Sequence, residues 1–502
     1  YGDHRDLHSF PTRRSSDLDR RPNISIQGQI REMLVSAILG RQLPAGDPLP
    51  SSRKLAKSLG VSRNTVVLAY QGLVDDGYLE SRERSGFYVT DDIMEGRADE
   101  PAAPPSTPEP RPSNGPDWAA RFQVHPSDQA NIEKPGNWLT YPYPFIYGQV
   151  DQSLFPIAQW RECSRQALGR KGMDVWTGDA LAADDPMLVE QIQTRLLPRR
   201  GILARDDEIL VTLGAQNALY ILAALLVRED TRVAIEDPGY PDVRNIFGLK
   251  TDHILPVPVD AHGLPVDKQL DGADIVFVTP SHQAPTTVTM PKARRQDLLT
   301  RAGEKDFVII EDDYEWETNY VSEPTPALKS MDTAGRVIYV GSLSKTLFPG
   351  LRLGYLVGPA PLIREARALR RLMLRHAPNN NQRTAALFLA LGHHDSLVHK
   401  LQKAYRERWK IMGRALADHL PGWSKAPTFG GTSYWVSGPT GFDAGKLADR
   451  ALDDGVIIEP GRVTFAQPNP PRNHFRLGFS SIAAERIEPG IRLLADIVKR
   501  DF

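Results

Sequence analysis

Short apolar runs alternate with helical patterns through the second half of this 502-residue chain, and the alternation leaves few folds open. The runs are rich in Val, Ile and aromatic residues and have the length of strands. They lie at residues 209–212, 233–236, 275–279, 307–311, 337–341 and 355–357, with helical spacing at 218–227 and 294–302. This order predicts an α/β fold with a mostly parallel, doubly wound sheet, which binds ligands at the carboxyl ends of its strands.

One of these strand ends carries a lysine between hydroxyl groups. The stretch RVIYVGSLSKTLFPGLRLGYLVG places Lys345 in a turn after a buried strand, with Ser342, Ser344 and Arg352 close by in sequence. Pyridoxal phosphate requires such a lysine, whose amine condenses with the cofactor aldehyde, and its phosphate suits the neighbouring hydroxyls and the arginine. Taken alone, the same stretch fits an ordinary loop lysine equally well.

Two other chemistries are disfavoured. Ser342 and Lys345 also form the S-x-x-K pattern of serine acylases, but the S-D-N and K-T-G motifs of that class do not follow in the chain. The glycines near residues 438–446 lack P-loop spacing, and no strand leads into G-x-G-x-x-G, so nucleotide binding has no support.

A second strand end offers a place for a phosphate. The run at residues 209–212 leads through Gly214 into a helix that begins near Ala215 and Gln216. Free amides and the dipole at the start of a helix can hold an anion.

A third strand end supplies groups for a pyridine ring. In the run 307–314 a period of two places Asp312 and Tyr314 on the same side of the strand end. An ionised Asp312 would keep a pyridine nitrogen protonated, and Tyr314 could donate to the ring oxygen. Without this context, the EDDY sequence would be interpreted as an acidic loop.

The first part of the chain has a different pattern. Three stretches with helical apolar spacing, two of them preceded by serine, come before two short strands around a charged turn. The expected helices lie at residues 26–39, 53–59 and 63–75, and the strands lie within 77–89. Basic residues outnumber acidic ones ten to six between residues 20 and 90, which suits a nucleic-acid surface. The order predicts a winged helix-turn-helix.

The sequence GRQLPAGDPLPSSRKLAKSLGVSRNTVVLAYQGLVDDGYLESRERSGFYV resembles the GntR family of winged helix-turn-helix regulators, over about residues 27–90. The resemblance implies binding to double-stranded DNA. The residues that would contact DNA are Arg53, Arg63, Asn64, Thr65, Arg82, Arg84 and Gly86. Leu68 and Phe87 depart from the family pattern, which leaves the operator sequence open. The alternative is a small basic domain whose arginines are merely solvated.

Residues from about 145 to 502 resemble fold-type I pyridoxal-phosphate aminotransferases. The segments that carry the resemblance are FIYGQVDQSLFPIAQW, RRGILARDDEILVTLGAQNAL, IEDPGYPDVR, VTPSHQAPTT, VIIEDDYE, GSLSKTLFPGLRLGY and HFRLGFS. It implies pyridoxal 5'-phosphate as cofactor, no metal, and Lys345 as the catalytic residue that forms the internal aldimine.

The resemblance also assigns residues to the parts of the cofactor. Those that would bind it are Lys345, Asp312 at the pyridine nitrogen, Tyr314 at the ring oxygen, Tyr240 stacked on the ring, His282, and Ala215, Gln216, Ser342, Ser344 and Arg352 around the phosphate. Arg476 would pair with an effector carboxylate, the alternative being a surface arginine on a strand. Departures from the family pattern, such as Ala284 and Thr287, lie on the ligand side and indicate an unusual effector.

Composition divides the chain into parts. The sequence DLHSFPTRRSSDL resembles a translated sequencing adapter. A later stretch rich in Pro, Ala, Glu and Ser has no apolar periodicity, which indicates a linker. The expected parts are a non-native leader at 1–20, the DNA-binding domain at 21–90, the linker at 91–130, and the aminotransferase-like domain at 131–502, with a large part at about 170–390 and a small part at about 391–502.

This order of parts resembles the MocR/GabR subfamily of bacterial transcription regulators. The resemblance implies that an amine or amino-acid effector displaces Lys345 to form an external aldimine and thereby alters operator binding. It implies a homodimer, head-to-tail and domain-swapped, on an operator with two half-sites. A single cysteine, Cys163, and the lack of a run long enough to span a membrane fit a cytoplasmic protein at the bacterial nucleoid.

Two other functions remain open from the sequence. The chain could be a true aminotransferase that carries a DNA-binding module, because Lys345 could still act as the proton shuttle, so its status as an enzyme is undecided. It could also be a cofactor-free dimer that only bridges two DNA modules. The identity of the effector and the choice between activation and repression are open as well.

Overall fold

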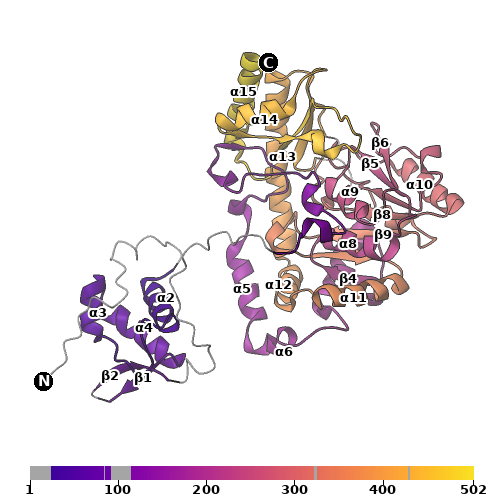
Figure 1. Cartoon of the computed structure of the whole chain (residues 1–502). Coiled ribbons are helices and arrows are strands. Elements are labelled where there is room, and N and C mark those ends of the chain that lie inside the picture. Colours follow the sequence, from indigo (N-terminus) through magenta and orange to yellow (C-terminus); the bar gives the residue numbers. More distant parts are fainter. Residues whose placement is uncertain (1–23, 84, 92–114, 322–324, 428–429) are drawn as a thin grey trace. The chain divides into compact units, whose positions relative to one another are not determined.

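The computed structural model describes residues 24–83, 85–91, 115–321, 325–427 and 430–502. It divides into two compact units, Tyr1–Arg121 and Phe122–Phe502, which are drawn in Figure 1. The expected leader, most of the expected linker and Arg84 lie outside the described residues. None of the described helices is both long and apolar enough to cross a membrane.

The first unit contains the expected helices and wing. Its elements are α2 (Ile26–Leu39), α3 (Ser52–Leu59), α4 (Arg63–Asp75), β1 (Leu79–Arg82) and β2 (Gly86–Val89), and the two strands pair antiparallel. Ser51 caps α3 and Ser62 caps α4, because each side chain accepts a hydrogen bond from a backbone N–H in the first turn. Apolar side chains of all three helices and both strands, among them Ile30, Leu59 and Tyr70, form one buried core.

A seven-stranded sheet forms the centre of the second unit. Its strands are β4 (Ile209–Thr212), β5 (Val233–Asp237), β6 (Ile254–Pro258), β7 (Ile275–Val278), β8 (Val308–Asp312), β9 (Val337–Ser342) and β10 (Gly354–Val357), in the spatial order β4-β10-β9-β8-β7-β5-β6. The pairs formed by β5 to β9 are parallel, and β10 runs antiparallel to both of its neighbours. The prediction of a mostly parallel sheet is therefore confirmed.

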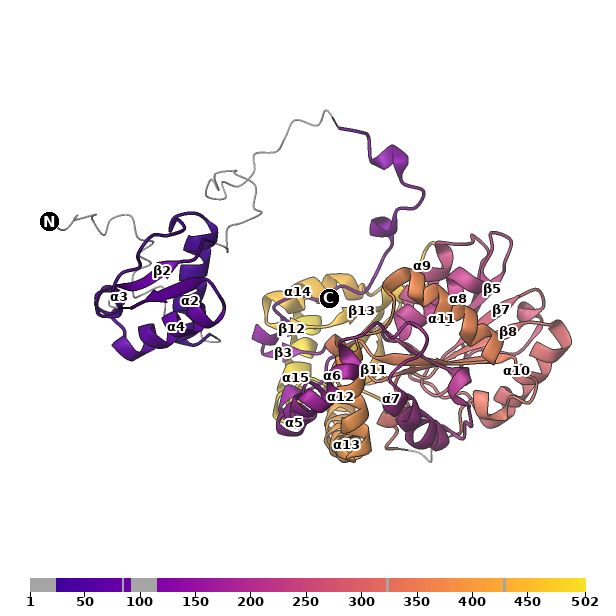
Figure 2. The same cartoon turned by 90° about the horizontal axis from the view of Figure 1, so that it is seen from below.

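Helices cover both faces of this sheet (Figures 1 and 2). They include α8 (Ala215–Leu226), α9 (Pro241–Gly248), α10 (Lys292–Lys305) and α11 (Ala360–Leu374). Along β7, Ile275 and Phe277 pack with side chains of α8 and α11, whereas Val276 and Val278 pack with those of α10. Burial on both faces explains why these strands appear in the sequence as continuous apolar runs.

The C-terminal part of the second unit is built on a smaller sheet. Its strands β11 (Ser433–Ser437), β13 (Glu459–Pro460) and β14 (His474–Gly478) are antiparallel, and α13 (His393–His419), α14 (Ala444–Asp453) and α15 (Ala484–Asp501) pack near them. An early strand, β3 (Tyr143–Pro144), pairs in parallel with β12 (Val456–Ile457). This pairing places the segment near residue 143 beside the C-terminal part of the unit. The chain then continues from there to the first strand of the main sheet, β4.

Further helices of the second unit pack together. They are α5 (Ile157–Ala167), α6 (Met173–Trp176), α7 (Pro186–Gln191) and α12 (Asn379–Ala390), with α5 and α7 both packed against α12.

Candidate functional site

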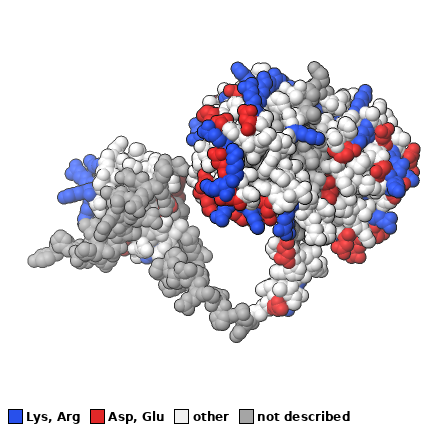
Figure 3. Space-filling model, turned by 90° about the horizontal axis from the view of Figure 1, so that it is seen from above, with Lys and Arg blue, Asp and Glu red and all other residues white. Residues whose placement is uncertain are grey.

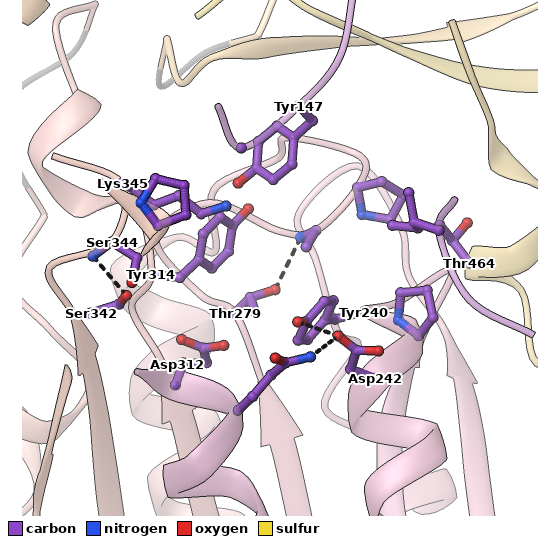
Figure 4. Close-up of a pocket in the computed structure, with 18 of the residues that line it drawn as sticks. Tyr147, Tyr240, Asp242, Thr279, Asp312, Tyr314, Ser342, Ser344, Lys345 and Thr464 are labelled. Atoms are coloured by element: carbon purple, nitrogen blue, oxygen red, sulfur yellow. Dashed lines mark hydrogen bonds between the residues drawn. The ribbon is translucent and has the colours of Figure 1, made fainter. Parts of the chain in front are cut away.

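A cavity of about 270 Å³ lies at the carboxyl ends of the central strands. Residues just after β4, β5, β7, β8 and β9 line it, as expected for a doubly wound sheet. Figure 4 shows several of their side chains directed at the same space. The structure brings together these sequence-predicted residues: Lys345, Asp312, Tyr314, Tyr240, Ala215, Gln216, Ser342, Ser344, Arg352 and Arg476.

Lys345 follows β9 and is buried. Its Nζ lies 4.2 Å from the centre of the Tyr147 ring and 5.9 Å from that of Tyr314. Burial lowers the pKa of Lys345 to about 8, because the charged form loses hydration, although the carboxylate of Glu315 favours that form. The amine is consequently close to its neutral, nucleophilic state near physiological pH.

Asp312 is the last residue of β8 and is 3% exposed. Its Oδ1 has no hydrogen-bond partner among the described residues. Burial and, to a smaller extent, the neighbouring charge of Asp313 raise the pKa of Asp312 to about 8, whereas Lys345 acts against both. A carboxyl in this state would gain most from a ligand that brings a buried N–H or a positive charge.

The start of α8 and the loop after β9 bring together groups that can hold an anion. Gly214, which precedes α8, has a φ of +84°, and a Cβ at this position would lie 3.3 Å from Nη2 of Arg352. The glycine therefore allows the backbone amides of the helix start and the guanidinium to lie close together. Ser342 Oγ accepts a hydrogen bond of 3.2 Å from the backbone N–H of Ser344. The Oγ of Ser344 is buried with no partner among the described residues, so it is left to hydrogen-bond a ligand.

Asp242, which sequence reasoning missed, connects three residues of the cavity. Its Oδ2 accepts hydrogen bonds from Tyr240 Oη at 2.6 Å and from Gln216 Nε2, and its Oδ1 accepts one from Asn131 Nδ2 at 2.7 Å. The spacing of two residues between Tyr240 and Asp242 was visible in the sequence, but nothing in the sequence indicated Asn131. The segment that contains Asn131 is held further by Gln129, whose side chain donates to the backbone oxygen of Asn245 at 3.1 Å.

Arg476 lies on β14, and its Cζ is 4.0 Å from the centre of the Tyr147 ring. Two cations, Lys345 and Arg476, thus contact the same aromatic ring. Arg476 Nε donates a hydrogen bond of 2.9 Å to Glu459 Oε2. Arg476 is therefore a buried residue that lines the cavity, rather than the surface arginine of the alternative interpretation.

Tyr147 is fixed through its backbone. Its N–H donates a hydrogen bond of 3.1 Å to Glu459 Oε1, and its carbonyl oxygen accepts one from Lys134 Nζ. Lys134 Nζ also lies 3.2 Å from Glu459 Oε1. The sequence placed Tyr147 inside a family segment without a role, and it contained no signal for Lys134 or Glu459, because they come from distant parts of the chain.

His282 does not line the cavity. Its Nε2 lies 3.2 Å from Oε2 of Glu315, which also accepts a hydrogen bond from Thr432. Burial lowers the pKa of His282 to about 3. A Cβ on Gly431 would lie 2.3 Å from the imidazole ring, so the backbone packs closely against His282.

The residues predicted to contact DNA lie on the surface of the first unit. Arg53, Arg63 and Asn64 are exposed near the starts of α3 and α4, and Thr65 is half-buried, with its backbone N–H bonded to the cap Ser62. In the wing, Arg82 is exposed and lies 4.2 Å from the centre of the Tyr88 ring. Gly86 has a φ of +116° and open space around it. On the face of this unit seen in Figure 3, Lys and Arg side chains gather on one side.

Both parts of the chain match known families. Residues 26–89 match the family described as bacterial regulatory proteins, gntR family, and residues 186–493 match aminotransferase class I and II. The chain is 45% identical over 472 residues to the HTH-type transcriptional regulator TauR of Rhodobacter capsulatus, covering 94% of this chain and 96% of that protein. It is 30% identical to the probable rhizopine catabolism regulatory protein MocR of Rhizobium meliloti, covering 95% and 94%.

Solved aminotransferases resemble the second unit. An archaeal alanine:glyoxylate aminotransferase superposes with a TM-score of 0.67 at 28% identity, covering 72% of this chain and 91% of its own. Pyrococcus horikoshii kynurenine aminotransferase superposes with a TM-score of 0.69 at 27% identity, covering 76% and 98%.

Proposed function

This chain belongs to the MocR-type transcription regulators, in which a gntR-family module precedes an aminotransferase class I and II domain, and we propose that an amine or amino-acid effector bound in its cavity changes its affinity for operator DNA. The observation that carries the proposal is the position of Lys345. Its buried amine lies in the same cavity as Asp312 and the anion site at the start of α8, within a chain that also carries a DNA-binding module.

The residues around the cavity suit pyridoxal 5'-phosphate. Asp312 Oδ1 and Ser344 Oγ are buried without partners among the described residues, and a pyridine N–H and a phosphate oxygen would satisfy them. When bound, this cofactor supplies an aldehyde that condenses reversibly with primary amines. The residues that would hold it are Lys345, Asp312, Tyr314, Tyr240, Ala215, Gln216, Ser342, Ser344 and Arg352. His282, also predicted to bind the cofactor, is not among the residues that line the cavity and lies beside the Glu315 carboxyl.

The side chains at the cavity have separate tasks in this proposal. Lys345 Nζ, with its pKa near 8, can hold or release a proton close to neutral pH, as a site that exchanges amines requires. Tyr240 presents its ring to the cavity while Asp242 holds its hydroxyl. Arg476 would bind the acid group of the effector.

Operator binding changes only if the effector stabilises one conformation of the protein more than another. Asp242 offers a physical route, because it joins Gln216 and Tyr240 to Asn131. Asn131 belongs to the stretch of the second unit that follows the expected linker. A ligand that changes the hydrogen bond between Gln216 and Asp242 would therefore also change the hydrogen bond between Asp242 and Asn131.

We propose further that the protein acts as a homodimer, arranged head-to-tail with exchanged domains. Two winged helices would then contact an operator with two half-sites. The protein would act where the chromosome lies, in the bacterial cytoplasm.

The proposal is tested on the purified full-length chain loaded with pyridoxal phosphate. Candidate amines are titrated while the visible absorbance of the bound cofactor and the fluorescence anisotropy of a labelled operator fragment are followed. We expect one class of amine to change both signals over the same concentration range. Amines that change the absorbance but leave operator affinity unaltered would exclude the regulatory coupling.

A second function, amino transfer, is favoured by one observation. Lys345 retains the position and the lowered pKa of a proton shuttle. Repeated turnover, measured as keto acid formed in excess over protein, would establish activity as an enzyme. A single turnover or none fits a regulator.

A further inference from the structure

Two apolar side chains of helix α4, Val67 and Leu68, lie outside the hydrophobic core of the first unit. The residues of α4 that do belong to this core are Val66, Ala69, Tyr70 and Leu73. Leu68 is 46% exposed and Val67 is half-buried, and neither is among the described side chains that form the core or pack against it. The core of the unit therefore does not account for this apolar pair.

Helical geometry places the apolar pair beside Asn64. Val67 and Leu68 follow Asn64 by three and four positions, and residues at these spacings are neighbours on one face of a helix. Gln71, which is exposed, continues the same face one turn later. Asn64 is exposed in the first turn of α4, the part of a recognition helix that reaches the base edges. The apolar pair thus stands on the face that would enter the major groove.

Leu68 and Phe87 both depart from the family pattern, but packing explains only Phe87. The Phe87 ring lies 5.0 Å from the Tyr70 ring, and its side chain packs against the core of the unit. Leu68, in contrast, is exposed on the outer face of α4. Single exposed leucines are common on protein surfaces, but this one stands where a base would be contacted. Its burial would require a partner outside the unit.

The charges around the apolar pair suit a nucleic-acid duplex. Arg53 and Arg63 are exposed near the starts of α3 and α4, and Arg82 is exposed in the wing. Lys and Arg side chains also gather on one side of this unit in Figure 3. Positive side chains of this kind bind the phosphates of a duplex, whereas an apolar protein surface would gain nothing from them. The surroundings therefore favour DNA as the partner.

The major groove offers an apolar side chain one suitable group. This group is the C5-methyl of thymine, whereas the other groups that distinguish the bases there are hydrogen-bond donors and acceptors. An apolar side chain placed against those polar groups would remove them from water without replacing their hydrogen bonds. A valine and a leucine at the base edges should consequently favour thymine.

We propose that Val67 and Leu68 contact the C5-methyl group of a thymine in the operator half-site, and that this contact determines the preferred base at that position. The proposal rests on the operator binding proposed above. It adds two specificity-determining residues to the predicted DNA-contacting set, which consists of polar side chains and a glycine.

The test uses the full-length chain and a duplex that it selects from a pool of random double-stranded DNA. Each thymine of the selected half-site is replaced in turn by deoxyuridine, which lacks only the C5-methyl group. Affinity is measured by fluorescence anisotropy. We expect one position at which the replacement weakens binding about fourfold, the effect of exposing one buried methyl group. Uniform affinity across the whole series would overturn the proposal.

Variants show whether the apolar pair causes this loss. The double variant Val67→Ala, Leu68→Ala should bind the thymine and uracil duplexes with nearly equal affinity, and it should keep the helix, because alanine favours helices. The conservative double variant Val67→Ile, Leu68→Met should still distinguish the two duplexes. Ile26→Ala, which shortens a side chain that is 42% exposed at the start of α2, is the matched control and should behave like the wild type.

The outcomes distinguish this proposal from the one it rests on. If the wild type selects no sequence, operator binding itself fails. If a sequence is selected but the alanine double variant keeps the wild-type distinction between thymine and uracil, the methyl contact is overturned while operator binding stands. A double variant that changes the self-association of the chain, measured by sedimentation, and leaves this distinction intact would assign the apolar pair to a protein interface instead.

Discussion

Asn131 donates its side-chain amide to Asp242 across 2.7 Å, and this hydrogen bond joins the stretch after the expected linker to the wall of the cavity. The same carboxylate receives Tyr240 and Gln216 on its other oxygen. A single aspartate thus contacts a residue proposed to stack on the cofactor, one proposed to hold its phosphate, and one outside the aminotransferase-like motifs.

Asn131→Ala should weaken the response of operator affinity to effector. Loss of this hydrogen bond costs about 1 kcal/mol and releases the stretch around residue 131 from α9. Hydrogen exchange of its amides should become faster, and the effector-dependent shift in operator affinity should become smaller. Gln129→Ala is the control, since it removes a neighbouring anchor to α9 without touching Asp242. Equal responses in both variants would argue against a specific role for Asp242.

Lys345→Ala should abolish the visible absorbance of bound pyridoxal phosphate and the response to effector, because the buried amine is the proposed covalent partner of the cofactor. Basal operator binding should be largely retained, since the residues predicted to contact DNA lie in the first unit. Absorbance spectra and operator anisotropy check both expectations, with Lys410→Ala as an exposed control. A normal effector response in Lys345→Ala would disprove the proposed switch.

The cofactor-free protein should lose stability as the pH rises from about 4 to about 8, and Asp312 should contribute to this loss. The pKa of Asp312 is raised from 3.8 to about 8, so between these values the folded state holds a proton that the unfolded state has released. Folding is then opposed by up to about 1.4 kcal/mol for each pH unit. Asp312→Asn stays uncharged, so its free energy of unfolding should depend less steeply on pH.

Urea unfolding of the cofactor-free wild type and of Asp312→Asn, at several pH values between about 5 and 8, measures this difference. Glu317, another buried carboxyl with a raised pKa, is not among the groups that shift the pKa of Asp312, so its contribution cancels in the comparison. The same variant should bind pyridoxal phosphate more weakly. Parallel pH profiles for the two proteins would contradict the assignment of Asp312.

Arg63→Ala should weaken operator binding by about 1–3 kcal/mol and reduce discrimination against unrelated DNA, if Arg63 contacts a base. Its exposed side chain stands in the first turn of α4, where a recognition helix meets the major groove. Arg82→Ala, in the wing, should instead weaken binding to all sequences alike and lower the salt dependence by about one unit of slope. Anisotropy titrations at several salt concentrations separate the two; identical behaviour would refute the distinction.

Local patterns account for the parts of the fold that the sequence predicted. The helices α2 to α4 follow from apolar spacing and capping serines within single stretches, and the strands β4, β5 and β7 to β10 follow from short apolar runs. The edge strand β6 was missed, because Pro256 and Pro258 interrupt it and only Val257 is fully buried. Lys345, Asp312 and the start of α8 were predicted together because strand ends of one parallel sheet meet at one edge.

The sequence by itself determined the order of the two modules, the class of sheet and the strand-end residues around Lys345, since each depends on chemistry within a few neighbouring positions. Only the tertiary structure decided that Asn131 reaches Asp242, that Lys134 and Arg476 share Glu459, and that Tyr147 lies against two cations. Apart from Arg476 and Glu459, which are partners on the paired strands β13 and β14, these contacts join residues separated by more than a hundred positions, and no periodicity or spacing along the chain records them.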